Sequence, residues 1–243
     1  MVYPPGNLSI PGPAGALECI LREAPGTGLW AVVSHPHPLY GGTMHNKVVY
    51  RTALALEESG YQTIRYNFRG VGGSAGVHDE GRGEADDLRA VLDHVTGARG
   101  GREVLLAGFS FGAWIGARVG AADPRVRSLL HVGVVTKLFE RLPQEAFRKP
   151  CAAVQGESDE HGEPSRVEEI LRPGPSARLL VVAGADHFFK GKIPELDAAL
   201  RGAIHFLTAG LTAGLRTGPG AGLTAASEEP PREGARETDP PRT

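Results

Sequence analysis

Residues 104–116 read V-L-L-A-G-F-S-F-G-A-W-I-G, and this stretch decides the fold that we expect. An apolar run typical of a strand enters the pentapeptide G-F-S-F-G (108–112), and small residues with helical spacing follow from Ala113. A strand, a sharp turn and a helix around G-x-S-x-G hold the serine in a strained conformation with its hydroxyl exposed. Glycines at positions 108 and 112 leave room for the strand and the helix to approach. We therefore interpret Ser110 as a nucleophile, against the alternative of a glycine-rich turn with an idle serine.

Length and composition predict one globular domain. The chain has 243 residues, of which 41% are hydrophobic, so it can bury a substantial core. A net charge of −2 without a basic block gives no reason to expect a nucleic-acid or membrane partner. Cys19 and Cys151 lie far apart in a chain that needs no disulfide, which favours a reducing compartment. With no signal peptide and no membrane-spanning apolar run evident, we expect a cytoplasmic monomer or homodimer.

Strand-type and helix-type patterns alternate along the chain. Strands are expected over residues 16–22, 29–34, 61–68, 104–107, 127–135, 151–155 and 177–183, and helices over 46–58, 84–95, 163–171 and 193–208. Strands that are apolar on both faces and alternate with helices indicate a parallel sheet covered on both sides. The pattern therefore predicts an α/β, doubly wound domain over residues 1–210. Residues 1–15 are expected to form an irregular arm, and residues 16–22 an edge strand.

The helix and strand patterns end near Gly210. Residues 211–243 are rich in glycine, proline, alanine and charge, and contain few large apolar residues. Such a segment cannot bury enough surface to offset the entropy lost on ordering. We predict a disordered tail.

A nucleophilic serine needs a base, and the base needs a third group that orients it. In sheets of this kind, reactive groups collect at the carboxyl ends of the strands. Asp159 follows the strand over residues 151–155, and His187 follows the last strand. The order Ser, Asp, His is the one expected for the G-x-S-x-G turn. We therefore predict the catalytic residues Ser110, Asp159 and His187.

Other residues compete for two of these roles. Glu157 and Glu160 flank Asp159, which is preferred because it lies far enough past the strand for the chain to turn back. Asp186 is interpreted as a helix cap or a solvated loop charge. For His187, the alternative is a partly buried structural histidine.

Two backbone N–H groups are needed to stabilise an oxyanion. The N–H of Phe111, directly after the nucleophile and at the helix start, is the first candidate. The second should come from H-P-H-P-L-Y (35–40), where the prolines have no N–H to offer. His37 is preferred there, with Tyr40 (backbone or hydroxyl) as the alternative.

No metal or organic cofactor is expected. His35 and His37, with His45 nearby, lack a cysteine or carboxylate at a ligand spacing. The loop G-V-G-G-S (70–74) has neither G-K-[ST] nor a G-x-G-x-x-G that opens a helix, so a bound nucleotide is not indicated. Arg69 is interpreted as a structural ion-pair partner.

Several motifs in order carry a resemblance to a known family. They are H-P-H-P-L-Y-G-G-T-M-H-N-K-V-V (35–49), N-F-R-G-V-G-G-S-A-G (67–76), G-F-S-F-G-A (108–113), Q-G-E-S-D (155–159) and D-H-F-F (186–189). Over about residues 10 to 208 the chain resembles the α/β-hydrolase superfamily, and within it a group of small, lidless bacterial predicted hydrolases. The resemblance implies a mostly parallel sheet of about seven or eight strands with helices on both faces. It also implies that Ser110 is the nucleophile, Asp159 the acid and His187 the base.

One departure from the family pattern affects the oxyanion loop. Many relatives in the superfamily carry H-G where this chain has His35-Pro36. The loop is therefore built differently, and the second N–H donor is the less secure of the two.

The expected reaction is a two-step transfer of an acyl group to water. Only about 15 residues separate Val135 from Cys151, where relatives with a lid usually insert it. A shallow, open site favours small or exposed esters, so a carboxylesterase is the first expectation. Tyr40, Phe109 and Phe188 are the candidate substrate-binding residues, and Phe111 and Phe189 are further candidates for the same apolar wall; for each of the five, the alternative is a place in the core. Thioesterase or peptidase chemistry would use the same residues, and a non-catalytic binding protein is the alternative from another class.

Overall fold

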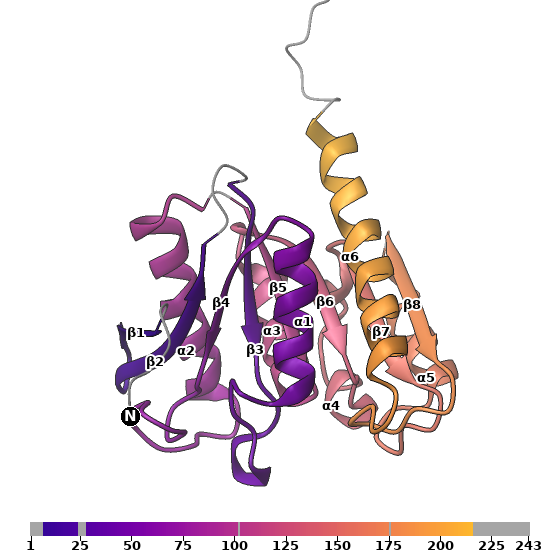
Figure 1. The fold of residues 1–243 in the computed structure, drawn as a ribbon, viewed down its shortest axis with the longest axis horizontal. Helices are drawn as coiled ribbons and strands as arrows, with labels where there is room; N and C mark the ends of the chain where they lie inside the picture. The colour runs from indigo at the N-terminus through magenta and orange to yellow at the C-terminus, as the bar shows by residue number, and fades with distance from the viewer. Residues whose placement is uncertain (1–6, 24–27, 102, 175, 216–243) are drawn as a thin grey trace, which may run out of the picture.

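The computed structural model describes residues 7–23, 28–101, 103–174 and 176–215. Eight strands form one sheet in the order β1-β2-β4-β3-β5-β6-β7-β8 (Figure 1). β2 pairs antiparallel with both β1 and β4, and every pairing from β4 to β8 is parallel. The strands are β1 (Asn7–Gly12), β2 (Gly15–Arg22), β3 (Trp30–Ser34), β4 (Gln62–Tyr66), β5 (Val104–Phe109), β6 (Val126–Val132), β7 (Cys151–Gly156) and β8 (Ala177–Val182). The predicted α/β fold with a mostly parallel sheet is confirmed.

Helices cover both faces of the sheet. α1 (Lys47–Glu58) and α6 (Ile193–Leu215) contact each other on the face nearer the viewer in Figure 1. The other face is covered by α2 (Arg82–Asp93), α3 (Phe111–Ala122) and α5 (Pro164–Leu171). The described part of the chain also contains four short helical segments, which are η1 (Pro38–Tyr40), η2 (His94–Ala98), α4 (Thr136–Phe139) and η3 (Gln144–Phe147).

Two apolar cores lie on opposite faces of the sheet. Leu106 of β5 packs in the core under α2, α3 and α5, whereas its neighbour Leu105 packs in the core under α1 and α6. This division follows from the strand geometry, because successive side chains point to opposite faces. All six residues of β5 are buried, as expected for a central parallel strand.

The N-terminal segment differs from the prediction. Residues 7–12 form β1, so the expectation of an irregular arm over residues 1–15 is wrong for this part, and β2 is the second strand rather than the edge. Gly12 pairs with Gly15 where the two strands turn, and Gly15 adopts a φ of 116°. The glycines and prolines that suggested irregular structure belong partly to this hairpin turn.

The C-terminal helix is longer than predicted. α6 ends at Leu215, seven residues past the predicted helix end at Thr208 and beyond the predicted domain boundary at residue 210. The remainder of the predicted tail, residues 216–243, lies outside the described residues.

Cys19 and Cys151 are free, buried thiols. Burial raises the pKa of each thiol from 9.0 to about 12, so both are neutral packing groups. Within the described segments, no helix has the length and apolar character needed to cross a bilayer. The cytoplasmic location and the monomeric or homodimeric state stay predictions.

The carboxyl ends of the parallel strands meet at one edge, the lower one in Figure 1. The loops after β3, β5, β7 and β8 lie at this edge. The segment after β6 is short, as expected, although it contains two helical segments, α4 and η3, instead of at most one. No large lid is therefore inserted at this edge within the described part of the chain.

The turn between β5 and α3 leaves no space for a side chain at either glycine. A Cβ at Gly108 would lie 2.4 Å from the carbonyl carbon of Gly112. A Cβ at Gly112 would lie 2.5 Å from the Ser34 oxygen at the end of β3 and 2.6 Å from the His35 oxygen. The predicted role of the two glycines, which is to let strand and helix approach, is confirmed.

We expect Gly112→Ala to lower the free energy of unfolding by roughly 1–3 kcal/mol, because the methyl group must displace backbone atoms. The matched control is Gly116→Ala in the same helix, where a Cβ meets only the Leu106 Cβ at 3.9 Å. This control should be neutral or stabilising, since alanine favours helix over glycine by about 1 kcal/mol. Urea unfolding followed by circular dichroism measures both changes. Equal stability of the two variants would contradict the steric argument.

Candidate active site

Ser110 occupies the sharp turn that leads from β5 into α3. Its backbone has φ 56° and ψ −116°, a conformation that residues with a side chain rarely adopt. The turn is held because the Ser110 N–H donates to the Val132 oxygen at 2.8 Å and the Ser110 carbonyl accepts from Ala113 N–H at 3.0 Å. Strain of this kind persists only where the surrounding structure imposes it, which is typical of functional sites.

A chain of hydrogen bonds joins Ser110, His187 and Asp159. The Ser110 Oγ lies 3.0 Å from His187 Nε2, and His187 Nδ1 lies 2.8 Å from Asp159 Oδ2. The histidine and the aspartate are buried, with exposed fractions of 2% and 5%. The three residues come from the loops after β5, β7 and β8, so the sheet brings the predicted residues together. The arrangement lets the imidazole take a proton from the hydroxyl while the carboxylate fixes its tautomer.

Asp186 orders the turn that carries His187. Its Oδ1 accepts the N–H groups of Phe188 and Lys190 at 3.1 and 2.9 Å. Phe189 adopts a positive φ of 53° in this turn, with its ring in the core beneath α6. Asp186 is therefore a half-buried turn residue before α6.

The two glutamates next to Asp159 do not reach His187. Glu157 Oε2 accepts the Gly184 N–H at 2.7 Å, which ties the β7 loop to the β8 loop. Glu160 is exposed and lies 3.7 Å from the His161 ring. Of the three acidic residues, Asp159 alone contacts the histidine.

Gln155 is a site residue that the sequence analysis missed. This fully buried side chain donates from Nε2 to Asp159 Oδ2 and to the Gly162 oxygen, both at 2.8 Å, while its Oε1 accepts the Val134 N–H at 2.7 Å. The other Asp159 oxygen accepts the His161 N–H at 2.8 Å. The sequence does contain a sign of this role, because Gln155 is the one polar residue at the end of the otherwise apolar run C-A-A-V-Q.

Two backbone N–H groups near Ser110 donate no hydrogen bond to any described residue, those of Phe111 and His37. Several other amides of the β3 loop are already paired. Leu39 N–H donates to His37 Nδ1 at 3.2 Å, and Tyr40 N–H donates to the His37 oxygen at 3.1 Å. The geometry therefore favours His37 over the Tyr40 backbone as the second donor.

His35 anchors the same loop from inside the protein. Its Nε2 accepts the Phe68 N–H at 3.0 Å, and Nδ1 donates to the Pro36 oxygen at 2.6 Å. Burial lowers the pKa of His35 from 6.5 to about 4, so the ring is neutral near pH 7. Both ring nitrogens are thus occupied. In the described part of the chain, no group of three or more His, Cys, Asp or Glu side chains is arranged to hold a metal.

The glycine-rich loop over residues 70–74 is filled by a carboxylate of the protein itself. Glu18 Oε2 accepts the Gly73 N–H at 2.7 Å and the Asn67 amide at 2.8 Å. Arg69 forms a bidentate ion pair with the fully buried Asp87, at 2.7 Å for the closest pair. The Arg69 ion pair matches the structural role that the sequence predicted for this residue.

A cavity of about 280 Å³ opens over Ser110. It is lined by Pro36, His37, Tyr40, Gly41, Gly42, Asn46, Ser110, His161, His187 and Phe188. Tyr40 and Phe188 are exposed aromatic side chains at this cavity. Phe109 does not line it, because its ring is buried beside His187 with the ring centroids 5.1 Å apart. Phe111 does not line the cavity either, because its ring is buried and packs against His37 with the ring centroids 4.8 Å apart.

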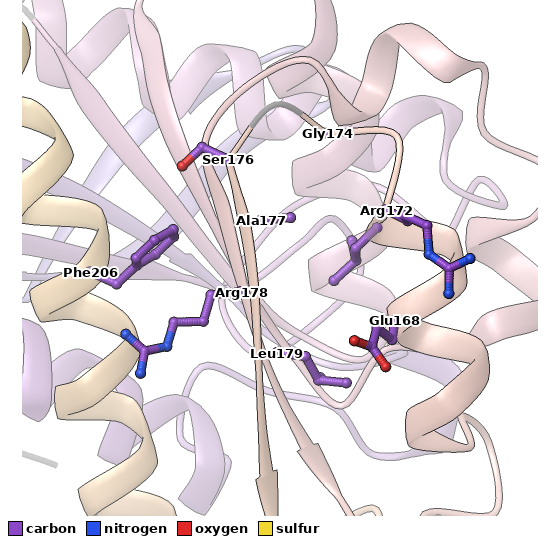
Figure 2. Close-up of a pocket in the computed structure, with 9 residues that line it drawn as sticks. Glu168, Arg172, Gly174, Ser176, Ala177, Arg178, Leu179 and Phe206 are labelled. Carbon is purple, nitrogen blue, oxygen red and sulfur yellow. The ribbon is translucent and has the colours of Figure 1, made fainter.

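A second cavity, of about 440 Å³, lies along the edge strand β8 and contains none of these residues (Figure 2). Arg178 points toward Phe206 of α6 on one side of the strand, with the guanidinium 5.8 Å from the ring centroid. Glu168 of α5 and Arg172, directly after this helix, lie on the other side. This cavity brings no nucleophile and base together, so the cavity over Ser110 is the candidate active site.

Comparisons with known proteins identify the relatives of this chain. A family model described as serine aminopeptidase, S33, matches residues 37–138. An uncharacterised protein from Rickettsia prowazekii is 34% identical over 202 residues, which cover 78% of this chain and 84% of that protein.

Two solved structures extend the comparison. An α/β serine hydrolase homologue from Coxiella burnetii is 38% identical with a TM-score of 0.74, over 83% of this chain and 98% of that one. A lidless α/β serine hydrolase from Xanthomonas campestris is 34% identical with a TM-score of 0.73, over 84% and 96%. The chain belongs to the α/β serine hydrolase family, among members without a lid, and it is a hydrolase.

His35 should make stability depend on pH. Its folded pKa of about 4 lies below the unfolded value near 6.5, so the unfolded chain binds the proton more readily. The contribution of neutral His35 is complete above about pH 6.5 and is lost as the pH falls toward about 4. We expect His35→Gln, which cannot titrate, to weaken the fall in unfolding free energy between pH 7 and pH 5. Urea titrations at both pH values measure this, and an unchanged pH dependence would contradict it.

Proposed function

We propose that this protein is a carboxylesterase-like serine hydrolase that cleaves small or exposed acyl esters through an acyl-enzyme. The observation that carries the proposal is the hydrogen-bonded chain from Ser110 through His187 to the buried Asp159, at 3.0 and 2.8 Å. A serine, a histidine and an aspartate in this geometry suit acyl transfer.

The proposed reaction has two steps. Ser110 Oγ attacks the ester carbonyl carbon while His187 Nε2 takes the hydroxyl proton, and the backbone N–H groups of Phe111 and His37 stabilise the oxyanion. The C–O bond breaks, and His187 passes the proton to the departing alcohol. Water then attacks the acyl-serine with His187 again as the base, which releases the acid and restores Ser110. Asp159 stabilises the imidazolium in both steps.

The cavity size favours small substrates. A volume of about 280 Å³ lies just below the range of about 300–1,000 Å³ that small-molecule sites occupy. The short segment after β6 leaves the cavity open on the solvent side. Long acyl chains would extend into water beyond the aromatic side chains of Tyr40 and Phe188.

A peptidase is the second candidate, because the matched family model is described as a serine aminopeptidase. An aminopeptidase holds the protonated amino terminus of its substrate, and a cation in a cavity is best paired with a carboxylate. The ten residues that line the cavity over Ser110 are apolar, neutral polar or histidine. This lining supports an ester substrate over a peptide with a free amino terminus.

Labelling with a fluorophosphonate probe tests the activated serine. We expect one covalent adduct by intact mass on the wild-type protein and on the control Ser165→Ala, whose serine is exposed on α5. Ser110→Ala and His187→Ala should give none, because the first lacks the nucleophile and the second lacks the base. Turnover of p-nitrophenyl acetate should fall by roughly 10³-fold or more in both. A folded wild-type protein without an adduct would favour the non-catalytic binding protein.

Gln155→Met tests whether the amide positions Asp159. The substitution removes a hydrogen bond to a carboxylate, an interaction of about 1.5–3 kcal/mol, so kcat should fall roughly 10- to 100-fold. The control Gln144→Met changes an exposed glutamine of η3 and should leave kcat unchanged. Ester hydrolysis is measured below the melting temperature of each variant. An unchanged kcat in Gln155→Met would show that Asp159 is held adequately without the amide.

A further inference from the structure

Asn46 is a cavity residue whose side-chain nitrogen has no assigned role. It caps α1, because its Oδ1 accepts the Val48 N–H at 2.9 Å. Its backbone N–H donates to the Thr43 oxygen at 3.0 Å, and its carbonyl accepts the Tyr50 N–H at 2.9 Å. Three of its four polar groups are therefore committed to the loop and the helix.

The capping bond fixes the orientation of the amide. Because the oxygen must face the helix N–H groups, the Nδ2 group faces away from them. Asn46 also lines the cavity that contains Ser110, and among the described residues no acceptor binds its Nδ2. The cavity thus holds a neutral donor of fixed direction, and the N-terminus of α1 adds partial positive charge beside it.

The sheet order indicates which part of a substrate meets this donor. β5 lies between β3 and β6, so the loop and helix after β3 stand on one side of Ser110, and the loops after β7 and β8 on the other. A departing alcohol must lie next to His187, which protonates it, and His187 is on the β8 side. Because the alcohol occupies the β8 side, the acyl chain lies on the β3 side, where Asn46 and Tyr40 line the cavity.

We propose that the site selects acyl groups that carry a second acceptor oxygen, such as a keto oxygen, and that Asn46 Nδ2 donates to it. The inference rests on the proposed esterase function, of which it names the substrate class. A purely hydrocarbon acyl chain would bury this N–H group without a partner, which is costly. An acyl chain with a keto oxygen satisfies it.

A matched pair of esters tests the proposal. p-Nitrophenyl 4-oxopentanoate and p-nitrophenyl pentanoate differ by one keto oxygen, and the ratio of their kcat/KM values is compared between variants, which cancels their intrinsic reactivities. Asn46→Ser keeps a good helix cap but loses the amide, and Asn46→Asp keeps the cap but presents an acceptor. In both, the ratio should fall by roughly 5-fold relative to wild type, as for one neutral hydrogen bond. His45→Ser, an exposed neighbour outside the cavity, should keep the wild-type ratio.

Thermal melting of each variant shows that the cap is retained. A ratio that stays unchanged in Asn46→Ser overturns the proposal, and so does a fall of equal size in His45→Ser.

A binding measurement decides the question without turnover. In ¹⁵N-labelled protein, the Asn46 side-chain amide signal is assigned by its absence from Asn46→Ser. Sodium 4-oxopentanoate should shift this signal more than sodium pentanoate does at the same concentration. Equal shifts, or none, overturn the inference. If the wild-type protein hydrolyses neither ester and forms no fluorophosphonate adduct, the proposed esterase function is wrong. The shift of the amide signal still shows whether Asn46 Nδ2 binds the keto oxygen.

Discussion

The close approach of β5, α3 and the end of β3 is the constraint on which the site depends. Gly112 lies against the Ser34 and His35 carbonyl groups, with no space for a Cβ. This contact brings the start of α3 against the end of β3. Phe111 and His37, whose amides donate to no described residue, belong to these two neighbouring segments. The strained backbone of Ser110 is the consequence of that packing, and it directs the hydroxyl toward His187.

Much of this arrangement could be predicted from the sequence because it depends on local patterns. The apolar run before Ser110 and the small residues after it indicated a strand, a turn and a helix. Asp159 and His187 each follow a predicted strand, and parallel strands bring their carboxyl ends to one edge. Chain order and sheet geometry together were therefore enough to gather the three residues.

What the sequence did not reveal depends on contacts between distant segments. β1 was not predicted, because the glycines and prolines around Gly12 and Gly15 suggested an irregular arm. They form part of the turn of a hairpin. The side chain of Phe109 points from β5 into the core, where its ring packs beside His187. Its position next to Ser110 in the sequence had suggested a place in the substrate cavity instead. In the sequence, Gln155 looks like an ordinary polar residue at the end of a strand. Its role follows only from its contacts with Asp159, Val134 and Gly162.

The spacing of the three residues along the chain has a consequence for biosynthesis. Ser110 is separated from His187 by 77 positions, and His187 from Asp159 by 28. Contacts this distant in sequence form late, because long loops must close first. Among the described residues, β8 is the last strand of the sheet along the chain, and the loop after it carries His187. A nascent chain that has folded only as far as β7 therefore holds its serine without a base, and the hydroxyl gains its base only after the segment that follows β8 has been synthesised.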